Sequence, residues 1–222
     1  MRTDVRKLSI LAMLAAMAYI MAAVSSYFRI PIVPAVPFLR YDPKDVIIVI
    51  GGFLYGPLAA FAMTAVVAFV EMFTVSVTGF IGLAMNIVSG TAFACTAAFI
   101  YKKKRTLGGA IVGLVIAALF ATAVMLMYNY LIAPIFLGWE RERVAALLIP
   151  GFLPFNLISN FVNAALVVLL YKPMKSIFTA SRLMPKLDEQ DKKGKINAGV
   201  IIAAIFVIAT CVLWWLTLQG RI

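Results

Sequence analysis

Long apolar runs separated by short polar segments dominate this sequence of 222 residues. Hydrophobic residues make up 64% of the chain and charged residues only 13%, whereas a soluble domain carries roughly 25% charged residues. A helix needs about 20 residues to cross the hydrocarbon core of a bilayer. The apolar runs lie at residues 8–28, 46–70, 80–101, 108–133, 149–171 and 197–218. The sequence therefore predicts an all-α integral membrane protein with no room for a soluble catalytic domain.

The run at residues 46–70 is long enough for one span, but Gly56-Pro57 divides it into two shorter ones. Two spans place the basic clusters within residues 2–7, 102–105 and 172–195 on one side of the membrane, as the positive-inside rule favours. Each of these two spans then holds only about 16 residues, so neighbouring helices must shield them or the bilayer must thin. We therefore predict a six-helix transmembrane bundle with an additional C-terminal transmembrane helix.

This topology defines three parts of the chain. Residues 1–175 form the six-helix, substrate-binding membrane domain, residues 176–195 a polar cytoplasmic linker, and residues 196–222 the additional helix. The protein is then a multi-pass protein of the cell membrane, with its N-terminus in the cytoplasm and its C-terminus outside. The simplest interpretation of the additional helix is a lipid-facing anchor.

Several kinds of chemistry lack their residues. The chain contains no histidine, which removes histidine-dependent triads and histidine-ligated metal sites. Cys95 and Cys211 both lie inside apolar runs and form no metal or disulfide motif. A G-x-S-x-G nucleophile motif and a phosphate-binding loop are also missing. Because the basic residues gather at the ends of apolar runs, the net charge of +11 reflects topology in a lipid bilayer and not nucleic-acid binding. We expect neither an enzyme nor a metal site.

Asparagine normally favours turns and caps, yet it recurs inside the predicted spans. The residues concerned are Asn86, Asn129, Asn156, Asn160 and Asn163. At 1.5 Å per residue, the first three lie roughly 6 to 11 Å below the outer surface, and the last three share one helical face. Glu71 lies at a similar depth, and we expect it to be the single buried acid, without a buried Lys or Arg. Such a cluster suits an uncharged solute with several donors and acceptors, although amides also join helices in purely structural subunits.

A proline-rich loop at residues 29–44 precedes the second helix, and no helix can form within it. Asp42 suits the N-cap position of the next helix, and Asp45 suits the residue that reaches back in a capping box. We predict that an apolar lid over the amides is formed by Phe38, Leu39 and Tyr41.

Together these segments resemble the riboflavin-specific substrate-binding (S) components of the energy-coupling-factor (ECF) vitamin transporter family, over roughly residues 8–175. The resemblance rests on residues 39–45, 52–57, 82–86, 129–130 and 154–158. It implies a six-helix bundle that holds the vitamin near the outer surface, without a cofactor. It also implies docking through Ala12 and Ala16 to a transmembrane coupling protein driven by two ATPase subunits.

The resemblance further implies that Asn129 and Asn156 bond the polar edge of a flavin ring, with Asn86 as a third contact. The full candidate set is Phe38, Leu39, Tyr41, Glu71, Asn86, Asn129, Asn156, Ser159 and Asn160. The chain departs from the family at Ser159, where relatives often have Lys, and in its additional helix.

Three alternatives stay open. The ligand could be flavin mononucleotide, for which Arg29, Arg40 and Lys44 are candidate phosphate contacts. It could instead be another vitamin, such as folate or thiamine. The chain could also be a structural membrane subunit that transports nothing.

Overall fold

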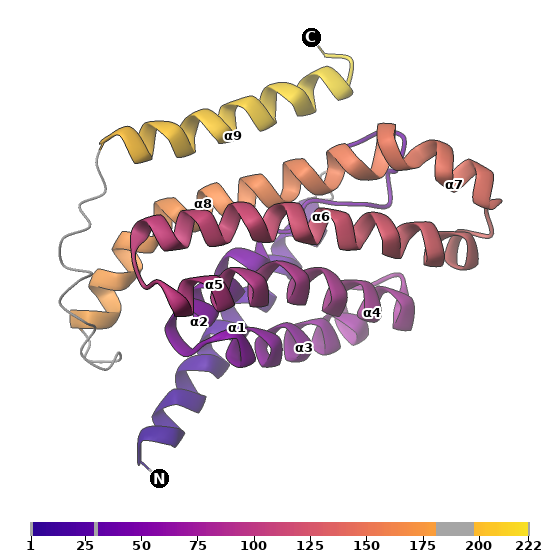
Figure 1. The fold of residues 1–222 in the computed structure, drawn as a ribbon. Coiled ribbons are helices and arrows are strands. Elements are labelled where there is room, and N and C mark those ends of the chain that lie inside the picture. The colour runs from indigo at the N-terminus through magenta and orange to yellow at the C-terminus, as the bar shows by residue number, and fades with distance from the viewer. Residues whose placement is uncertain (1, 29–30, 181–197, 222) are drawn as a thin grey trace.

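The computed structural model describes residues 2–28, 31–180 and 198–221 (Figure 1). Within those ranges the regular elements are all helices, apart from one isolated β-bridge. The elements are α1 (Arg2–Phe28), α2 (Lys44–Tyr55), α3 (Pro57–Thr74), α4 (Gly79–Gly90), η1 (Thr91–Cys95), α5 (Thr96–Lys103), α6 (Leu107–Leu137), α7 (Arg141–Leu147), η2 (Leu148–Phe152), α8 (Leu153–Ala180) and α9 (Ala198–Leu218). The helices run side by side, and α9 packs along α8 at the edge of the bundle.

Six helical stretches are long and apolar enough to cross a membrane. They are Val5–Phe28, Pro57–Thr74, Gly79–Lys103, Leu107–Leu137, Arg141–Tyr171 and Ala198–Leu218. The predicted class, an all-α membrane bundle with an additional C-terminal helix, is confirmed. The predicted boundaries of the linker and of the two membrane parts stay predictions, because residues 181–195 lie outside the described residues.

The helix α2 is the exception in length. It has 12 residues, about 18 Å at 1.5 Å per residue, which is too short for a hydrocarbon core of about 30 Å. No residue of α2 is exposed, because α1, α3, α5 and α8 surround it. The predicted shielding by neighbouring helices is therefore present. The predicted break at Gly56-Pro57 is confirmed, since Gly56 has a φ of 93° and Pro57 opens α3, the position where proline fits a helix best.

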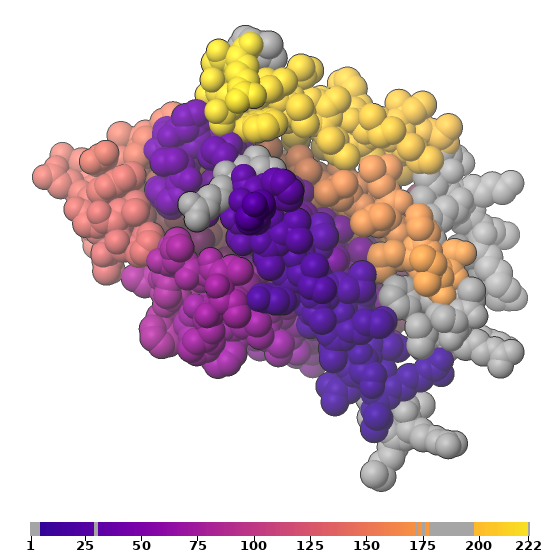
Figure 2. Space-filling view, turned by 180° about the vertical axis from the view of Figure 1, so that it is seen from behind, coloured from indigo at the N-terminus to yellow at the C-terminus, as the bar shows by residue number. Residues whose placement is uncertain are grey.

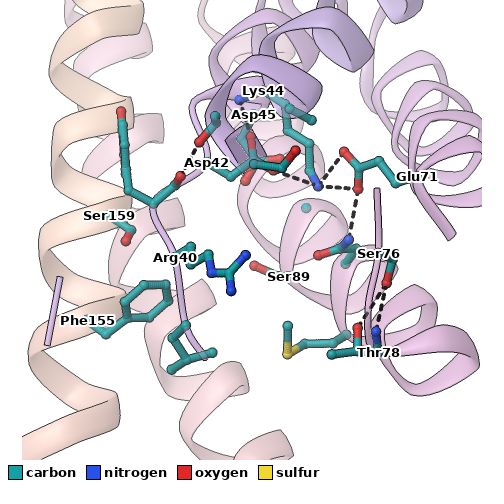
Figure 3. A pocket seen from close by; sticks show the side chains of 18 of the residues that line it. Arg40, Asp42, Lys44, Asp45, Glu71, Ser76, Thr78, Ser89, Phe155 and Ser159 are labelled. Atoms are coloured by element: carbon teal, nitrogen blue, oxygen red, sulfur yellow. Dashed lines mark hydrogen bonds and ion pairs between the residues drawn. The ribbon is translucent and has the colours of Figure 1, made fainter. Parts of the chain in front are cut away.

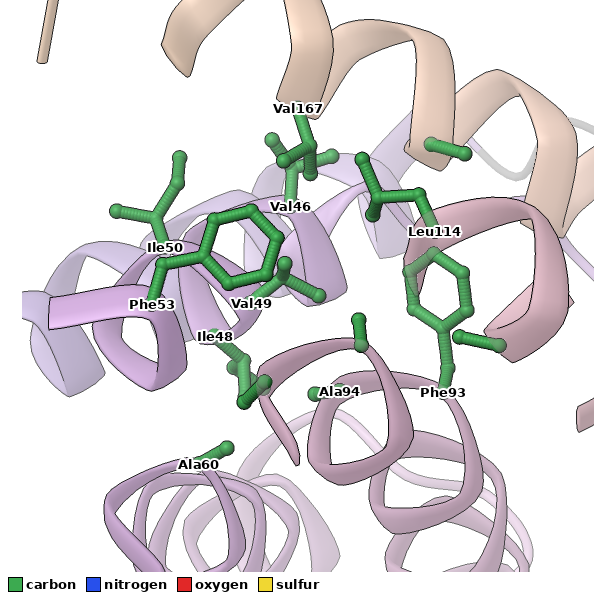
Figure 4. Close-up of a cluster of buried hydrophobic side chains, with 14 of the residues drawn as sticks. Val46, Ile48, Val49, Ile50, Phe53, Ala60, Phe93, Ala94, Leu114 and Val167 are labelled. Atoms are coloured by element: carbon green, nitrogen blue, oxygen red, sulfur yellow. The ribbon is translucent and has the colours of Figure 1, made fainter. Parts of the chain in front are cut away.

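The main apolar core is built around α2 (Figure 4). Its buried side chains include Ile48, Val49, Phe53, Phe93, Leu114 and Val167. Gly52 allows α2 to approach α3 and α5, since a Cβ there would lie 3.0 Å from the Cβ of Ala60 and 2.9 Å from that of Ala98. Small residues at helix contacts let backbones come close, so the core places α2 rigidly in the centre of the bundle.

Two π-helical segments, η1 and η2, interrupt the long helices. The second contains Pro150, which has no backbone N–H and so cannot continue a regular ladder of hydrogen bonds. The sixth span begins at Arg141 and not at residue 149 as the apolar run suggested. The reason is that α7, which contains charged residues, precedes the apolar run and joins it through η2, so hydropathy marks the edge of that run and not the start of the helical stretch.

The segment between α1 and α2, residues 31–43, is here called the lid segment. It contains no helix, as predicted, and its two ends are joined by an antiparallel backbone bridge between Pro31 and Arg40. Four side chains of the lid segment are buried in one apolar cluster with Val144 of α7 and Phe152 of η2. They are Ile32, Val33, Val36 and Leu39. The lid segment is therefore a packed layer over one end of the bundle.

Candidate functional site

A cavity of about 210 Å³ lies beneath the lid segment. All nine residues predicted to contact the substrate line it: Phe38, Leu39, Tyr41, Glu71, Asn86, Asn129, Asn156, Ser159 and Asn160. They come from the lid segment, α3, α4, α6 and α8, which are far apart in the sequence. The structure thus brings the predicted set together around one space, and their role in binding stays a prediction.

Two of the amides are held by their own helices. The Nδ2 groups of Asn129 and Asn156 each donate a hydrogen bond of 2.7 Å to the carbonyl four residues earlier, on Met125 and Phe152. Both side chains are buried, at 4% and 5% exposure. An amide has two N–H donors and one carbonyl acceptor, so one N–H and the carbonyl of each side chain remain for a molecule in the cavity.

The other two asparagines of α8 connect parts of the protein. Asn160 Nδ2 lies 3.2 Å from Thr122 Oγ1 and 3.4 Å from the carbonyl of Ala118, so it joins α8 to α6. Asn163 accepts a 2.8 Å hydrogen bond from the Tyr41 hydroxyl and donates to the carbonyl of Asp42 at 3.3 Å. The structural role weighed for these amides therefore applies to Asn160 and Asn163.

A buried ionic cluster forms the opposite wall (Figure 3). Lys44 Nζ lies 2.6 and 2.9 Å from the Glu71 carboxylate oxygens and 3.0 Å from Asp42 Oδ2. Asn86 Nδ2 donates to Glu71 Oε2 at 2.9 Å. The expectation of no buried Lys was wrong, because Lys44 is only 6% exposed. Its location at the start of α2 suggested exposure, and its partner Glu71, 27 positions later, was not visible in the local sequence.

Two buried polar atoms in the cavity wall have no hydrogen-bond partner among the described residues. They are Asp45 Oδ1 and Ser159 Oγ. The prediction that Asp42 is the N-cap was wrong, since α2 begins at Lys44 with Pro43 at the N-cap and without a side-chain cap hydrogen bond. Asp42 Oδ1 instead accepts from the N–H of Lys44, the first helical residue, at 3.0 Å. The predicted return contact from Asp45 is not formed by its Oδ1, and Asp45 turns towards the cavity (Figure 3). Glu71 is therefore not the single acid in this wall.

The lid segment is fastened at its inner end by Tyr41. The Ser25 hydroxyl donates to the backbone carbonyl of Tyr41, while the Tyr41 side chain donates to Asn163. Burial raises the pKa of the Tyr41 hydroxyl, and the carboxylates of Asp42 and Asp45 raise it further. The hydroxyl therefore keeps its proton at neutral pH and remains a donor.

Sequence reasoning missed part of the cavity wall. The lining residues that it did not propose as contacts include Ser25, Asp45, Met85, Ser89, Met125 and Phe155. Arg40 and Lys44, which it proposed only as phosphate contacts, and Asn163, which it placed on the polar face of its helix, also line the cavity. The position of Lys44 between two acids, Asp42 and Asp45, at the start of an apolar helix could have indicated a buried ion pair. Most of the others carry no signal, because a serine or methionine in an apolar run does not show which face of its helix lines a cavity. Arg29, a candidate phosphate contact, lies outside the described residues.

Ala12 and Ala16 lie away from the cavity, on the outer face of α1. Both are exposed, whereas Leu14, Ala15 and Ala18 of the same helix are buried in the bundle. The indigo atoms of α1 run across the face of the molecule in Figure 2. The predicted docking residues are thus open to a neighbour in the membrane.

The comparisons with known proteins agree with one another. Residues 6–171 match the family described as "ECF transporter, substrate-specific component". The riboflavin transporter RibU of Staphylococcus aureus (strain TCH60) is 30% identical over 173 residues, covering 75% of this chain and 89% of the relative. The riboflavin transporter FmnP of Bacillus subtilis (strain 168) is 28% identical over 181 residues, covering 77% of this chain and 93% of the relative.

A solved structure, described as the S component of a bacterial ECF transporter, has the same fold. It superposes with a TM-score of 0.68 at 29% sequence identity, covering 79% of this chain and 98% of that chain. The matched family region spans α1 to most of α8 and ends before α9. The chain therefore belongs to the family of substrate-specific components of ECF transporters, which are membrane-embedded binding subunits and not enzymes.

Proposed function

We propose that this chain captures riboflavin in the cavity beneath the lid segment and presents it to the transport machinery. The observation that carries the proposal is the convergence of carboxamides from α4, α6 and α8, those of α6 and α8 buried, on one cavity roofed by apolar side chains. The names of the relatives, which are riboflavin transporters, support the choice of ligand.

The amide side of the cavity suits the ring of the vitamin. The polar edge of a flavin ring presents an imide N–H between two carbonyl groups. The free carbonyls of Asn129 and Asn156 accept from such an N–H, and their remaining N–H groups donate to the ring carbonyls. Phe38, Leu39 and Phe155 line the same space and supply apolar contacts for the faces of the ring. In this orientation the flat ring lies under the lid segment.

The ionic side suits the sugar-like chain of the vitamin. Carboxylate oxygens accept strong hydrogen bonds from hydroxyl groups. Asp45 Oδ1 is buried without a partner among the described residues, while Glu71 and Asn86 line the cavity beside it. The hydroxyl groups of the ribityl chain would satisfy these acceptors.

Flavin mononucleotide is the second candidate, because Arg40 extends into the cavity (Figure 3). A guanidinium binds phosphate well. Three acids, Asp42, Asp45 and Glu71, also line the cavity and repel a phosphate. Riboflavin is therefore the preferred ligand of the two.

The remaining partners follow from the family. An S component works with the other components of an ECF transporter, and we propose that these are a transmembrane coupling protein and two ATPase subunits. The coupling protein would dock on the small-residue face at Ala12 and Ala16. The exposed basic residues 102–105 lie at the end of the bundle opposite the lid segment, which supports a cytoplasmic N-terminus and an external cavity mouth.

Titration of the detergent-purified chain with flavins tests this function. We expect one molecule of riboflavin to bind per chain, and riboflavin fluorescence to decrease on binding. Flavin mononucleotide should bind more weakly, and thiamine should not bind. A flavin absorption band in the purified protein, released on denaturation, would support the same conclusion. Saturation by thiamine or folate, with none by riboflavin, would overturn the choice of vitamin.

A further inference from the structure

The C-terminal helix α9 makes specific contacts beyond packing in lipid. It lies outside the region that matches the family, and most of its side chains are exposed. One stripe faces the bundle, at the helical spacing of a single face. It consists of Val200, Ala204, Val207, Cys211, Trp215 and Leu218. The C-terminal half of this stripe packs against the apolar cluster that includes Ile32, Val33 and Leu39 of the lid segment.

The last turn of α9 and the residue that follows it, Gln219, bind the lid segment by hydrogen bonds. The indole Nε1 of Trp215 donates to the carbonyl of Pro31 at 3.1 Å. Gln219 Nε2 donates to the same carbonyl at 3.0 Å and to the carbonyl of Ile32 at 3.3 Å. Two side chains one turn apart therefore hold the first residues of the lid segment, and an anchor that only faced lipid would have no need of these groups.

This contact is continuous with the roof of the cavity. Pro31 pairs through its backbone with Arg40, and Arg40, Leu39 and Tyr41 line the cavity. The inner end of the lid segment is held separately by Ser25 and Asn163. The lid segment is thus fastened to α1 and α8 at one end and to α9 at the other.

We infer that α9 is a brace for the lid segment, and that Trp215 and Gln219 are positioning residues that slow the release of bound ligand. In this inference a bound ligand leaves by displacement of the lid segment, and the contacts of Pro31 and Ile32 with Trp215 and Gln219 oppose that displacement. The kinetic part of the inference rests on the proposed function, while the bracing itself does not.

The test compares Trp215→Phe, Gln219→Leu and their combination with the wild-type chain. Phe keeps an aromatic ring in the packed stripe and removes the donor. Trp214→Phe is the matched control, because Trp214 is the adjacent residue and is 39% exposed. Hydrogen exchange of the ligand-free protein reports on the backbone amides of residues 32–42, and stopped-flow fluorescence reports on riboflavin release.

We expect the double variant to exchange these amides faster and to release riboflavin roughly three- to tenfold faster, with the Trp214→Phe protein unchanged in both. Unchanged exchange in the double variant would overturn the inference, as would acceleration spread equally over the lid segment and α6. If the wild-type chain binds no riboflavin, the proposed function fails, and the exchange measurement still decides whether α9 braces the lid segment.

Discussion

Single buried polar atoms distinguish this cavity from the apolar core beside it. In the core, small and branched side chains fill the space between helices. In the cavity wall, Ser159 Oγ and Asp45 Oδ1 are buried without hydrogen-bond partners among the described residues. An unsatisfied buried polar group costs about 1 to 3 kcal/mol. A ligand that supplies the partner recovers that free energy, which contributes to its binding.

Ser159→Ala separates the two effects. We expect the ligand-free variant to be as stable as the wild type, or more stable by up to about 1 kcal/mol, because an unpartnered hydroxyl is removed. Riboflavin binding should weaken by about 0.5 to 1.5 kcal/mol. Thermal unfolding and a riboflavin titration measure the two quantities. Ser26→Ala is the control, since Ser26 lines the cavity but its hydroxyl already donates to the carbonyl of Ala23. Equal affinities of Ser159→Ala and wild type would remove Ser159 from the binding site.

Lys44 and Glu71 depend on each other. Removing one member of a buried ion pair leaves an uncompensated charge and costs about 3 to 5 kcal/mol. We expect Lys44→Met to destabilise the protein by that amount, and Lys44→Met with Glu71→Gln to recover a large part of it. Unfolding of the two single variants and the double variant measures the coupling. Strictly additive losses would show that the pair does not act as a unit.

The sequence was informative about the amides and uninformative about the ionic cluster, for a physical reason. The depth of Asn129 and Asn156 follows from helix geometry alone, because every residue adds 1.5 Å along its helix. The pairing of Lys44 with Glu71 depends on how α2 and α3 rotate about their axes. That rotation is set by contacts such as the close approach at Gly52, which a single sequence does not reveal.

At the scale of elements, the short helix α2 organises the bundle. Its end could be predicted because glycine and proline, which break helices, follow it at Gly56-Pro57 and because the placement of the basic clusters favoured two spans over one. The start of α7 could not be predicted from hydropathy, since this helix begins before the apolar run at residues 149–171. The contact of α9 with the lid segment was also missed. Every residue has a backbone carbonyl, so the sequence does not show that the carbonyl of Pro31 accepts hydrogen bonds from Trp215 and Gln219.

Gly56→Ala tests the turn between α2 and α3. Gly56 has φ 93° and ψ 176°, a conformation open to glycine and costly to other residues, by about 1 to 3 kcal/mol. A Cβ at this position meets no atom within 4 Å, so the expected loss is backbone strain alone. Gly108→Ala, in open space within α6, should be neutral or slightly stabilising. Equal melting temperatures for the two variants would contradict the account of the turn.

At the scale of the whole molecule, the proposed binding site and the proposed docking face occupy different regions. The cavity lies at the lid end of the bundle, whereas Ala12 and Ala16 lie on the exposed face of α1, near the middle of that helix and outside the cavity lining. This separation allows the binding subunit to hold its ligand while its flank contacts another membrane protein.

Substitution on that flank should uncouple the two activities. We expect Ala12→Leu with Ala16→Leu to leave riboflavin affinity unchanged and to lower riboflavin uptake by the assembled transporter roughly tenfold or more, since larger side chains keep helix backbones apart. Ala203→Leu, at an exposed alanine of α9, is the control for added bulk on a lipid-facing surface. Uptake that falls equally in both proteins would contradict the proposed docking face.

The most direct test of the central claim is an equilibrium titration of purified protein with riboflavin, comparing wild type with Asn129→Ala and Asn156→Ala. The account predicts that each substitution weakens binding by about 1 to 3 kcal/mol, because polar groups of the ring lose their partners. Thr210→Val, at an exposed residue of α9, should bind as the wild type does. Titration curves for both asparagine variants that coincide with the wild-type curve would contradict the account.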